Sequence, residues 1–442
     1  MMHDKFVTTG YRSEAVVQPV LAGARSKLAK ASRIQAVMAL EGGAMKLSTL
    51  RTVGLAAAAL AVCAVPASAG TIKIGSLLTM SGSNAPLGEN IDKGMKLYMK
   101  LNQDKLPAGV KIEIITRDDG GPNAEKARQL AQELIIQEKV QILSGMTFTP
   151  NAMAAAPLCT EAKVPMVIMN AATSVITTMS PYIVRLSMTQ WQSGLPLGTW
   201  AAKTYKTAYI AVSDFGPGLD AKDAFTKGFT DAGGKIVGSV RMPVVNVAFA
   251  PFMQQVKAAN PEVLFVFVPA GKQATALMKA FGDLGLGKAG IKLIGPGDIT
   301  TDEELANMGE VSVGVLTVFH YSAAATRPAN KAFISAWKKE YGANSVPSFM
   351  AVGGWDGMDA IYHAIREQNG RIDPERTMEL MKRYKNANSP RGPISIDPET
   401  RDIVQTEYLR EVRKVGGELV NFEIGTVQTG VKDPWKEINH KK

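Results

Sequence analysis

The chain has 442 residues, of which 46% are hydrophobic and 20% charged, with 23 prolines and 41 glycines. This balance excludes a disordered, collagenous or coiled-coil protein, and the length predicts two domains because a domain usually holds about 100–200 residues. The net charge of +10 is divided equally between residues 1–69 and the much longer remainder, in which no long basic run occurs. Nucleic-acid binding is therefore not expected.

The first 44 residues are set apart from the rest of the chain. They show little periodic apolar pattern, and they precede Met45, an internal methionine that is well placed as a start. We therefore interpret residues 1–44 as an upstream extension that is not part of the natural protein.

Residues 45–69 predict a cleaved signal peptide and hence a periplasmic protein. Two basic side chains precede an apolar run from Val53 to Val65, and small residues end at Ala69. The run is shorter than the roughly 20 residues of a membrane-spanning helix, and the small residues suit cleavage after Ala69. A lipid anchor on Cys63 is the alternative.

Downstream of the signal, predicted strands alternate with predicted helices. The strands are expected at 71–78, 110–116, 140–143, 164–169, 183–186, 208–212, 235–240, 263–268, 291–294 and 311–318. The helices are expected at 90–101, 123–135, 150–162, 191–205, 220–232, 249–259, 271–284, 302–308, 328–341, 347–368 and 373–384. A final antiparallel pair, 403–414 and 418–426, turns at two glycines.

These elements predict an α/β fold with two doubly wound parallel-sheet lobes. Residues 263–268 form an almost continuous apolar run, which is typical of a parallel strand covered on both faces. About ten or more such strands are too many for one open sheet, so we expect two sheets with a cleft between them.

Motifs for catalysis, cofactors or metals are lacking. The sequence has no phosphate loop, no dinucleotide fingerprint, no nucleophile elbow and no cluster of cysteine and histidine. His320 is the one histidine considered as a general base, and no nucleophile motif accompanies it. Cys159 lies in an alanine-rich predicted helix and is interpreted as a small buried side chain. We expect no enzyme, no metal and no cofactor.

A series of short motifs in order resembles the periplasmic solute-binding proteins of the branched-chain amino-acid type. The motifs are Ile72-Lys73-Ile74-Gly75-Ser76-Leu77-Leu78-Thr79-Met80-Ser81-Gly82, Leu87-Gly88, Asp118-Asp119, Ser144-Gly145, Val164-Pro165, Asn170-Ala171-Ala172-Thr173, Arg185, Asp214-Phe215-Gly216-Pro217-Gly218, His320-Tyr321-Ser322 and Trp355-Asp356-Gly357. Together they cover nearly all of the chain after the signal.

The resemblance implies two lobes, joined by three crossing segments, that close over a small solute. Residues 70–189 with 321–402 would form lobe 1, and residues 190–320 with 403–442 would form lobe 2. The hinges would lie near Ser187–Gln190, Val318–Tyr321 and Asp402–Gln405. The implied partners are the solute and the permease subunits of an ABC importer, and the implied state is a monomer.

On the first lobe, the resemblance places ligand contacts at Leu87, Thr147, Phe148, Thr149, Ala171 and Thr173. Hydroxyl groups and the free backbone N–H groups at a helix N-terminus can hold a carboxylate without a buried counter-charge. The alternative is that Thr147 and Thr149 only cap the following helix.

On the second lobe, Phe215 matches an aromatic residue that covers the ligand in similar proteins. Trp191, His320 and Tyr321 are further candidates, of which Trp191 and Tyr321 can stack against a solute. A position in the core remains the alternative for Phe215 and Trp191.

Gln273 suggests which solute is bound. Family members that bind amino acids place an acidic side chain at the start of the helix after a strand that corresponds to 263–268, and Gln273 aligns there. A buried ammonium without a carboxylate partner would cost several kcal/mol. The sequence therefore favours an aromatic or phenylpropanoid-like acid over an amino acid. Branched-chain amino-acid binding, and a sensor that acts on a membrane receptor, are the alternatives.

Overall fold

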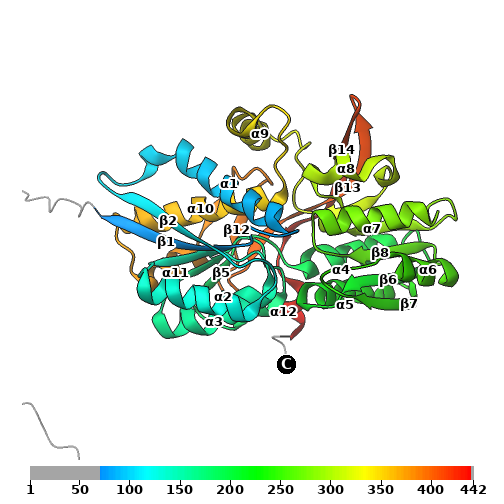
Figure 1. The fold of residues 1–442 in the computed structure, drawn as a ribbon, viewed down its shortest axis with the longest axis horizontal. Helices are drawn as coiled ribbons and strands as arrows, with labels where there is room; N and C mark the ends of the chain where they lie inside the picture. Colours follow the sequence, from blue (N-terminus) through cyan, green and yellow to red (C-terminus); the bar gives the residue numbers. More distant parts are fainter. Residues whose placement is uncertain (1–69, 440–442) are drawn as a thin grey trace, which may run out of the picture. The chain divides into compact units, whose positions relative to one another are not determined.

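The computed structural model describes residues 70–439. The predicted extension and signal peptide, residues 1–69, lie outside this part of the chain. The described residues form an α/β fold with two separate sheets and helices packed on them, as Figure 1 shows.

The first sheet has five parallel strands in the order β2-β1-β3-β4-β5. They are β1 (Thr71–Leu78), β2 (Lys111–Asp118), β3 (Ile142–Gly145), β4 (Met166–Ile168) and β5 (Ile183–Arg185). Helices α2 (Ala124–Gln132) and α3 (Thr149–Ala162) contribute to one core, and α1 (Ala85–Leu101), α9 (Pro328–Tyr341), α10 (Phe349–Glu367) and α11 (Pro374–Lys382) to another. A parallel sheet must be covered on both faces, and these two cores cover it.

The second sheet has nine strands. Its order is β11-β12-β13-β10-β9-β8-β6-β7, and β14 pairs with β13. The strands are β6 (Thr207–Ser213), β7 (Lys235–Met242), β8 (Val263–Phe267), β9 (Lys292–Pro296), β10 (Leu316–Phe319), β11 (Lys385–Asn386), β12 (Ile394–Ile396), β13 (Ile403–Val415) and β14 (Glu418–Val431). Its helices are α4 (Gln190–Ala201), α5 (Gly216–Asp231), α6 (Ala250–Ala259), α7 (Lys272–Asp283), α8 (Leu305–Met308) and, at the end, α12 (Pro434–Asn439).

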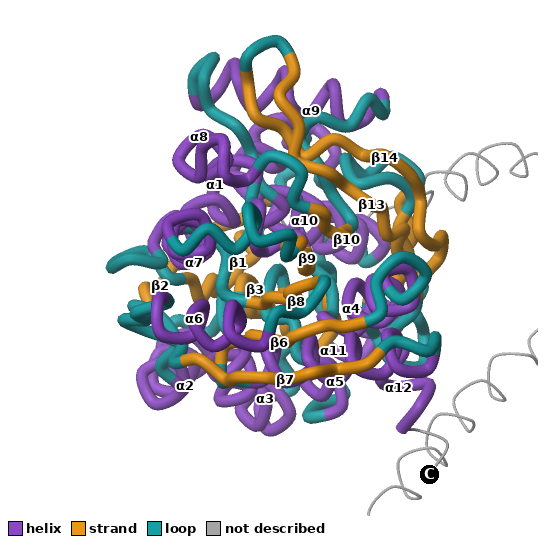
Figure 2. Tube along the Cα trace, turned by 90° about the vertical axis from the view of Figure 1, so that its right-hand side faces the viewer, coloured by secondary structure: helices purple, strands orange, loops and turns teal. Residues whose placement is uncertain are grey.

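The burial of two strands in this sheet follows their position. Every residue of β8 is buried, because β8 lies between β6 and β9. Strand β7 pairs only with β6 and, up to Arg241, alternates exposed with half-buried side chains, as an edge strand covered on one face does. Figure 2 shows β7, β6 and β8 one above another.

Three differences from the expected elements have local causes. Helix α1 begins at Ala85 and α5 at Gly216, earlier than the apolar periodicity indicates, because each has a proline in its first turn, where proline needs no N–H partner. The strand expected at 311–318 was too long. Gly309–Ser312 is a 3-10 helix and Gly314 has a positive φ of 82°, so β10 starts only at Leu316.

The chain passes from the first sheet to the second after β5, returns after β10 to the helices α9, α10 and α11 that pack on the first sheet, and enters the second sheet again through β11, β12 and β13. A buried arginine, Arg391, ties two of these crossings together. Its guanidinium donates to the backbone oxygen of Ser187 at 2.8 Å and to Gln405 Oε1 at 3.0 Å, and it pairs with Asp356 at 2.9 Å. These contacts fix the crossings against each other.

Candidate functional site

A pocket lies between the two lobes, at the carboxyl ends of strands from both sheets. In open α/β sheets this edge is the usual place for ligands. The residues that line it are Leu87, Thr147, Phe148, Thr149, Asn170, Ala171, Ala172, Met188, Gln190, Phe215, Pro217, Phe267, Pro269, Ala270, Asp298 and Met350. The space left between them is about 30 Å³, so an aromatic acid fits only if the lobes or the side chains move apart.

The first-lobe wall carries hydroxyl groups beside the start of α3. Thr147 Oγ1 accepts a hydrogen bond from the backbone N–H of Thr79 at 3.2 Å, and Thr149 Oγ1 lies 3.0 Å from Thr173 Oγ1. Within the described residues no side chain caps the first turn of α3, which follows Phe148. Free N–H groups and hydroxyls on one wall suit a carboxylate.

Aromatic and aliphatic side chains form most of the remaining surface. Phe148 comes from the first lobe, whereas Phe215 and Phe267 come from the second, with their ring centroids 6.0 Å apart and their planes tilted by 32°. Leu87 and Met350 add aliphatic surface from the first lobe. A flat apolar solute can pack between such side chains.

A carboxylate of the second lobe also lines the pocket. Asp298 lies in the 3-10 helix Gly297–Thr300, directly after β9, and its Oδ2 accepts a hydrogen bond from the side-chain amide of Gln190 at 3.2 Å. Burial raises the pKa of Asp298 to about 6. Two further acceptors of the lining, Gln190 Oε1 and Asn170 Oδ1, are buried without a partner among the described residues. The pocket therefore presents acceptors for a solute that carries donors.

Sequence reasoning missed Asp298 and Gln190. A signal was available for Asp298, since Gly-Pro-Gly-Asp follows a predicted strand, and the carboxyl ends of parallel strands meet at one edge.

Six of the eleven predicted contact residues line the pocket, namely Leu87, Thr147, Phe148, Thr149, Ala171 and Phe215. Thr173 lies behind Thr149 and reaches the pocket only through the hydrogen bond between the two hydroxyls. Trp191 is buried next to Gln190, outside the lining.

The other three predicted residues lie elsewhere. The side-chain amide of Gln273 donates to the backbone oxygen of Val244 at 2.7 Å, so it is directed toward the segment after β7. His320 packs against Phe319, with ring centroids 4.2 Å apart and planes tilted by 39°, and burial holds the pKa of His320 well below 6.5. Tyr321 is completely buried. None of the three lines the pocket. The expectation that the site lacks a carboxylate partner for an ammonium group rested on Gln273, and it therefore no longer applies.

The lobes touch each other beside the pocket. The backbone N–H of Ser174 on the first lobe donates to Asp220 Oδ2 on the second at 2.7 Å, and burial raises the pKa of Asp220 to about 6. A Cβ on Gly216, at the start of α5, would lie 2.5 Å from Thr173 Oγ1, so a larger residue here would have to displace that hydroxyl. The two walls therefore meet in a closed arrangement.

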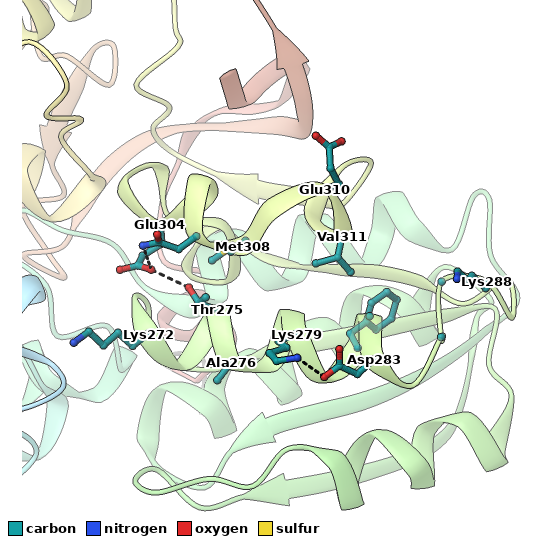
Figure 3. A pocket seen from close by; sticks show the side chains of 15 residues that line it. Lys272, Thr275, Ala276, Lys279, Asp283, Lys288, Glu304, Met308, Glu310 and Val311 are labelled. Atoms are coloured by element: carbon teal, nitrogen blue, oxygen red, sulfur yellow. Dashed lines mark hydrogen bonds and ion pairs between the residues drawn. The ribbon is translucent and has the colours of Figure 1, made fainter. Parts of the chain in front are cut away.

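A larger groove, about 970 Å³, lies on the second lobe alone (Figure 3). Helix α7 and the segment around α8 form it, with Lys279 paired to Asp283 at 2.7 Å and Thr275 bonded to Glu304 at 2.9 Å. Every residue that lines it comes from positions 272–311, so closure of the two lobes would not enclose a solute there.

Residues 70–439 contain no cluster of side chains suited to a metal ion. The same part of the chain contains no helix long and apolar enough to cross a membrane.

Two α/β lobes with a pocket between their strand ends define a two-lobed α/β binding protein. The chain matches the periplasmic binding protein family over residues 71–417 and belongs to that family. It is 42% identical over 379 residues to Leu/Ile/Val-binding protein homolog 6 of Brucella melitensis biotype 1. The aligned region covers 85% of this chain and 97% of that protein.

Solved structures agree with this assignment. A solute binding protein of an ABC transporter from Rhodopseudomonas palustris BisB5, in complex with 3,4-dihydroxybenzoic acid, is 48% identical, with a TM-score of 0.79 over 83% of this chain and 99% of that one. Another solute binding protein from R. palustris, in complex with 4-hydroxybenzoate, is 44% identical, with a TM-score of 0.78 over 82% of this chain and 98% of that one. The expected family, the two-lobed fold and a binding rather than an enzymatic role are confirmed.

Proposed function

We propose that this protein captures a small aromatic carboxylate between its lobes and delivers it to the permease subunits of an ABC importer. The signal peptide predicted at residues 45–69 would bring it to the periplasm. The observation that carries the proposal is the pocket itself, in which a wall of hydroxyls and free N–H groups faces the rings of Phe215 and Phe267. The bound hydroxybenzoates of the two R. palustris proteins support the same solute class.

Binding would act by closure. A ligand shifts an equilibrium between open and closed lobes only by its difference in affinity for the two forms, so it must touch both walls. The carboxylate would bind to Thr147, Thr149 and the start of α3, and the ring would pack against Phe148 and Phe215.

A branched-chain amino acid is the second candidate, and Asp298 is the observation that favours it. A buried carboxylate can receive an α-ammonium group, which would remove the desolvation cost that argues against an amino acid. The same carboxylate can instead accept a hydrogen bond from a ring hydroxyl, so both candidates use it.

Titration calorimetry separates the candidates. Residues 70–442 are unfolded and refolded to remove carried-over solute, and then titrated with 4-hydroxybenzoate, 3,4-dihydroxybenzoate, benzoate and leucine. We expect the hydroxybenzoates to bind with a dissociation constant of about 1 μM or tighter, equivalent to about 8 kcal/mol. Tight binding of leucine with no response to the benzoates would refute the aromatic proposal.

Two phenylalanine variants localise the binding. Phe215→Ala removes a ring from the pocket and should weaken binding about tenfold or more. Phe422→Ala removes an exposed ring on β14 and serves as the matched control, with unchanged affinity. Equal affinities for the two variants would place the solute outside this pocket.

A further inference from the structure

The end of the chain returns from the second sheet to the first lobe. Strand β14 ends at Val431, whose backbone oxygen accepts a hydrogen bond from Gln192 Nε2 at 2.9 Å. Residues 432–439, which include α12, then lie where the two lobes meet, with α12 against α4 of the second lobe (Figure 1). We call these residues the C-terminal strap. From the sequence they are expected in lobe 2, and their buried charged side chains bond to residues 174–177 and Asp402.

Two charged side chains of the strap are buried in these contacts. Asp433 Oδ1 accepts a hydrogen bond from Ser174 Oγ at 3.1 Å. Lys436 Nζ bonds to Asp402 Oδ2 and to Thr177 Oγ1, and the lysine is only 1% exposed. Burying an ammonium group costs several kcal/mol unless it is well paired, so this lysine marks a specific arrangement rather than a general gain in stability.

Arg185 connects Asp402 to the first-lobe wall of the pocket. Arg185 Nε pairs with Asp402 Oδ1 at 2.8 Å, and Arg185 Nη1 donates to the backbone oxygens of Ala171 at 2.9 Å and Thr173 at 2.8 Å. The strap, Asp402 and Arg185 therefore form a continuous chain of charged hydrogen bonds that ends on two carbonyl groups of residues 170–174, the ligand loop.

The ligand loop belongs to both the pocket and the lobe contact. Asn170, Ala171 and Ala172 line the pocket, and the backbone N–H of Ser174 bonds to Asp220 of the second lobe. Ser174 is therefore held by its hydroxyl to the strap and by its N–H to the opposite lobe. A shift of the strap would move the groups that line the pocket.

We propose that the C-terminal strap is a positioning element of the solute site, in which Lys436 and Asp433 hold the ligand loop in its binding geometry through Asp402, Arg185 and Ser174. Lys436 touches no pocket atom and acts through its neighbours. The expected effect of Lys436 on solute affinity rests on the proposed function. Its expected effect on the geometry of the ligand loop does not.

The test compares two lysines of the strap. Lys436→Met removes the buried ammonium and keeps a similar length. Lys432→Met is the matched control, because Lys432 pairs with Asp397 at 2.8 Å, is half exposed and makes no side-chain bond to Asp402. Calorimetry with 4-hydroxybenzoate gives the affinity, and hydrogen–deuterium exchange of the solute-free protein reports on the amides of residues 171–176.

We expect Lys436→Met to weaken 4-hydroxybenzoate binding about tenfold and to speed exchange of these amides, while Lys432→Met changes neither. A chain that ends at Lys432 should have the same two effects and serves if the point variant does not fold. Unchanged affinity and exchange in Lys436→Met, with only a lower melting temperature, would reduce the strap to a structural element and overturn the proposal. If the parent protein binds no benzoate, the proposed function fails, and exchange at residues 171–176 alone decides for or against the strap.

Discussion

The two walls of the pocket differ in chemistry. The first-lobe wall offers donors, namely the Thr149 hydroxyl and the start of α3, to an anionic group. The second-lobe wall offers the rings of Phe215 and Phe267 and the acceptor Asp298. A solute that satisfies both walls therefore has a carboxylate at one end and a donor elsewhere. The pair of walls therefore selects the solute by its chemical groups. The larger groove of Figure 3 is formed by the second lobe alone and offers no such pair of walls.

The largest expected effect comes from removing the support of the first-lobe wall. Arg185→Met leaves Asp402 without its guanidinium partner and removes the Arg185 donor from the buried carbonyl groups of Ala171 and Thr173, of which Thr173 keeps only a 3.3 Å bond from the backbone N–H of Ile176. Breaking a buried pair in this way should lower the free energy of unfolding by about 3–5 kcal/mol. Urea denaturation measures it, and a loss below about 1 kcal/mol would mean that the wall does not depend on Arg185.

The next effect tests the donors of the first-lobe wall. Thr149→Val keeps the shape of the side chain but removes the hydroxyl, so affinity for 4-hydroxybenzoate should fall about tenfold to a hundredfold, the usual effect of a hydrogen bond to a charged group. Thr199→Val removes an exposed helix hydroxyl that bonds to Leu195 and is the control. Equal affinities for the two variants would place the carboxylate elsewhere.

A smaller and more selective effect is expected on the second-lobe wall. Asp298→Asn keeps an acceptor oxygen but removes the charge, so binding of a ring hydroxyl should change only a few-fold, whereas binding of an ammonium group should fall about a hundredfold. Asp283→Asn, on the rim of the exposed groove, is the control. Loss of 4-hydroxybenzoate binding in Asp298→Asn alone would show that the charge itself is needed for the aromatic solute.

The smallest expected effect is a dependence of affinity on pH. Burial raises the pKa values of Asp220 and Asp298 from 3.8 to about 6, and opening the lobes would return both groups toward 3.8. Closure therefore takes up protons between about pH 4 and pH 6, and affinity for 4-hydroxybenzoate should rise a few-fold for each carboxyl that takes up a proton as the pH falls from 7 to 5.5. Calorimetry in buffers of different ionisation enthalpy counts these protons, and binding without proton uptake would contradict the expectation. An ammonium-bearing solute would show the opposite trend, because it requires the charged form of Asp298.

The sequence by itself determined the class of fold, because strands and helices follow from local periodicity. The apolar run of β8 indicated a strand covered on both faces, and the helix at Pro328–Tyr341 was predicted with its observed ends. Motif order was enough to indicate the family, and it located six residues that line the pocket, including Thr149 and Phe215.

Only the tertiary structure decided which side chains share a site. Asp298 lines the pocket and Gln273 does not, although both follow buried strands of the same sheet. Lys436 and Ser174 belong to the same hydrogen-bond network although more than 250 residues separate them in the sequence. Such contacts depend on how the lobes and the strap pack across long sequence distances, and the local pattern of hydrophobic residues does not encode that packing.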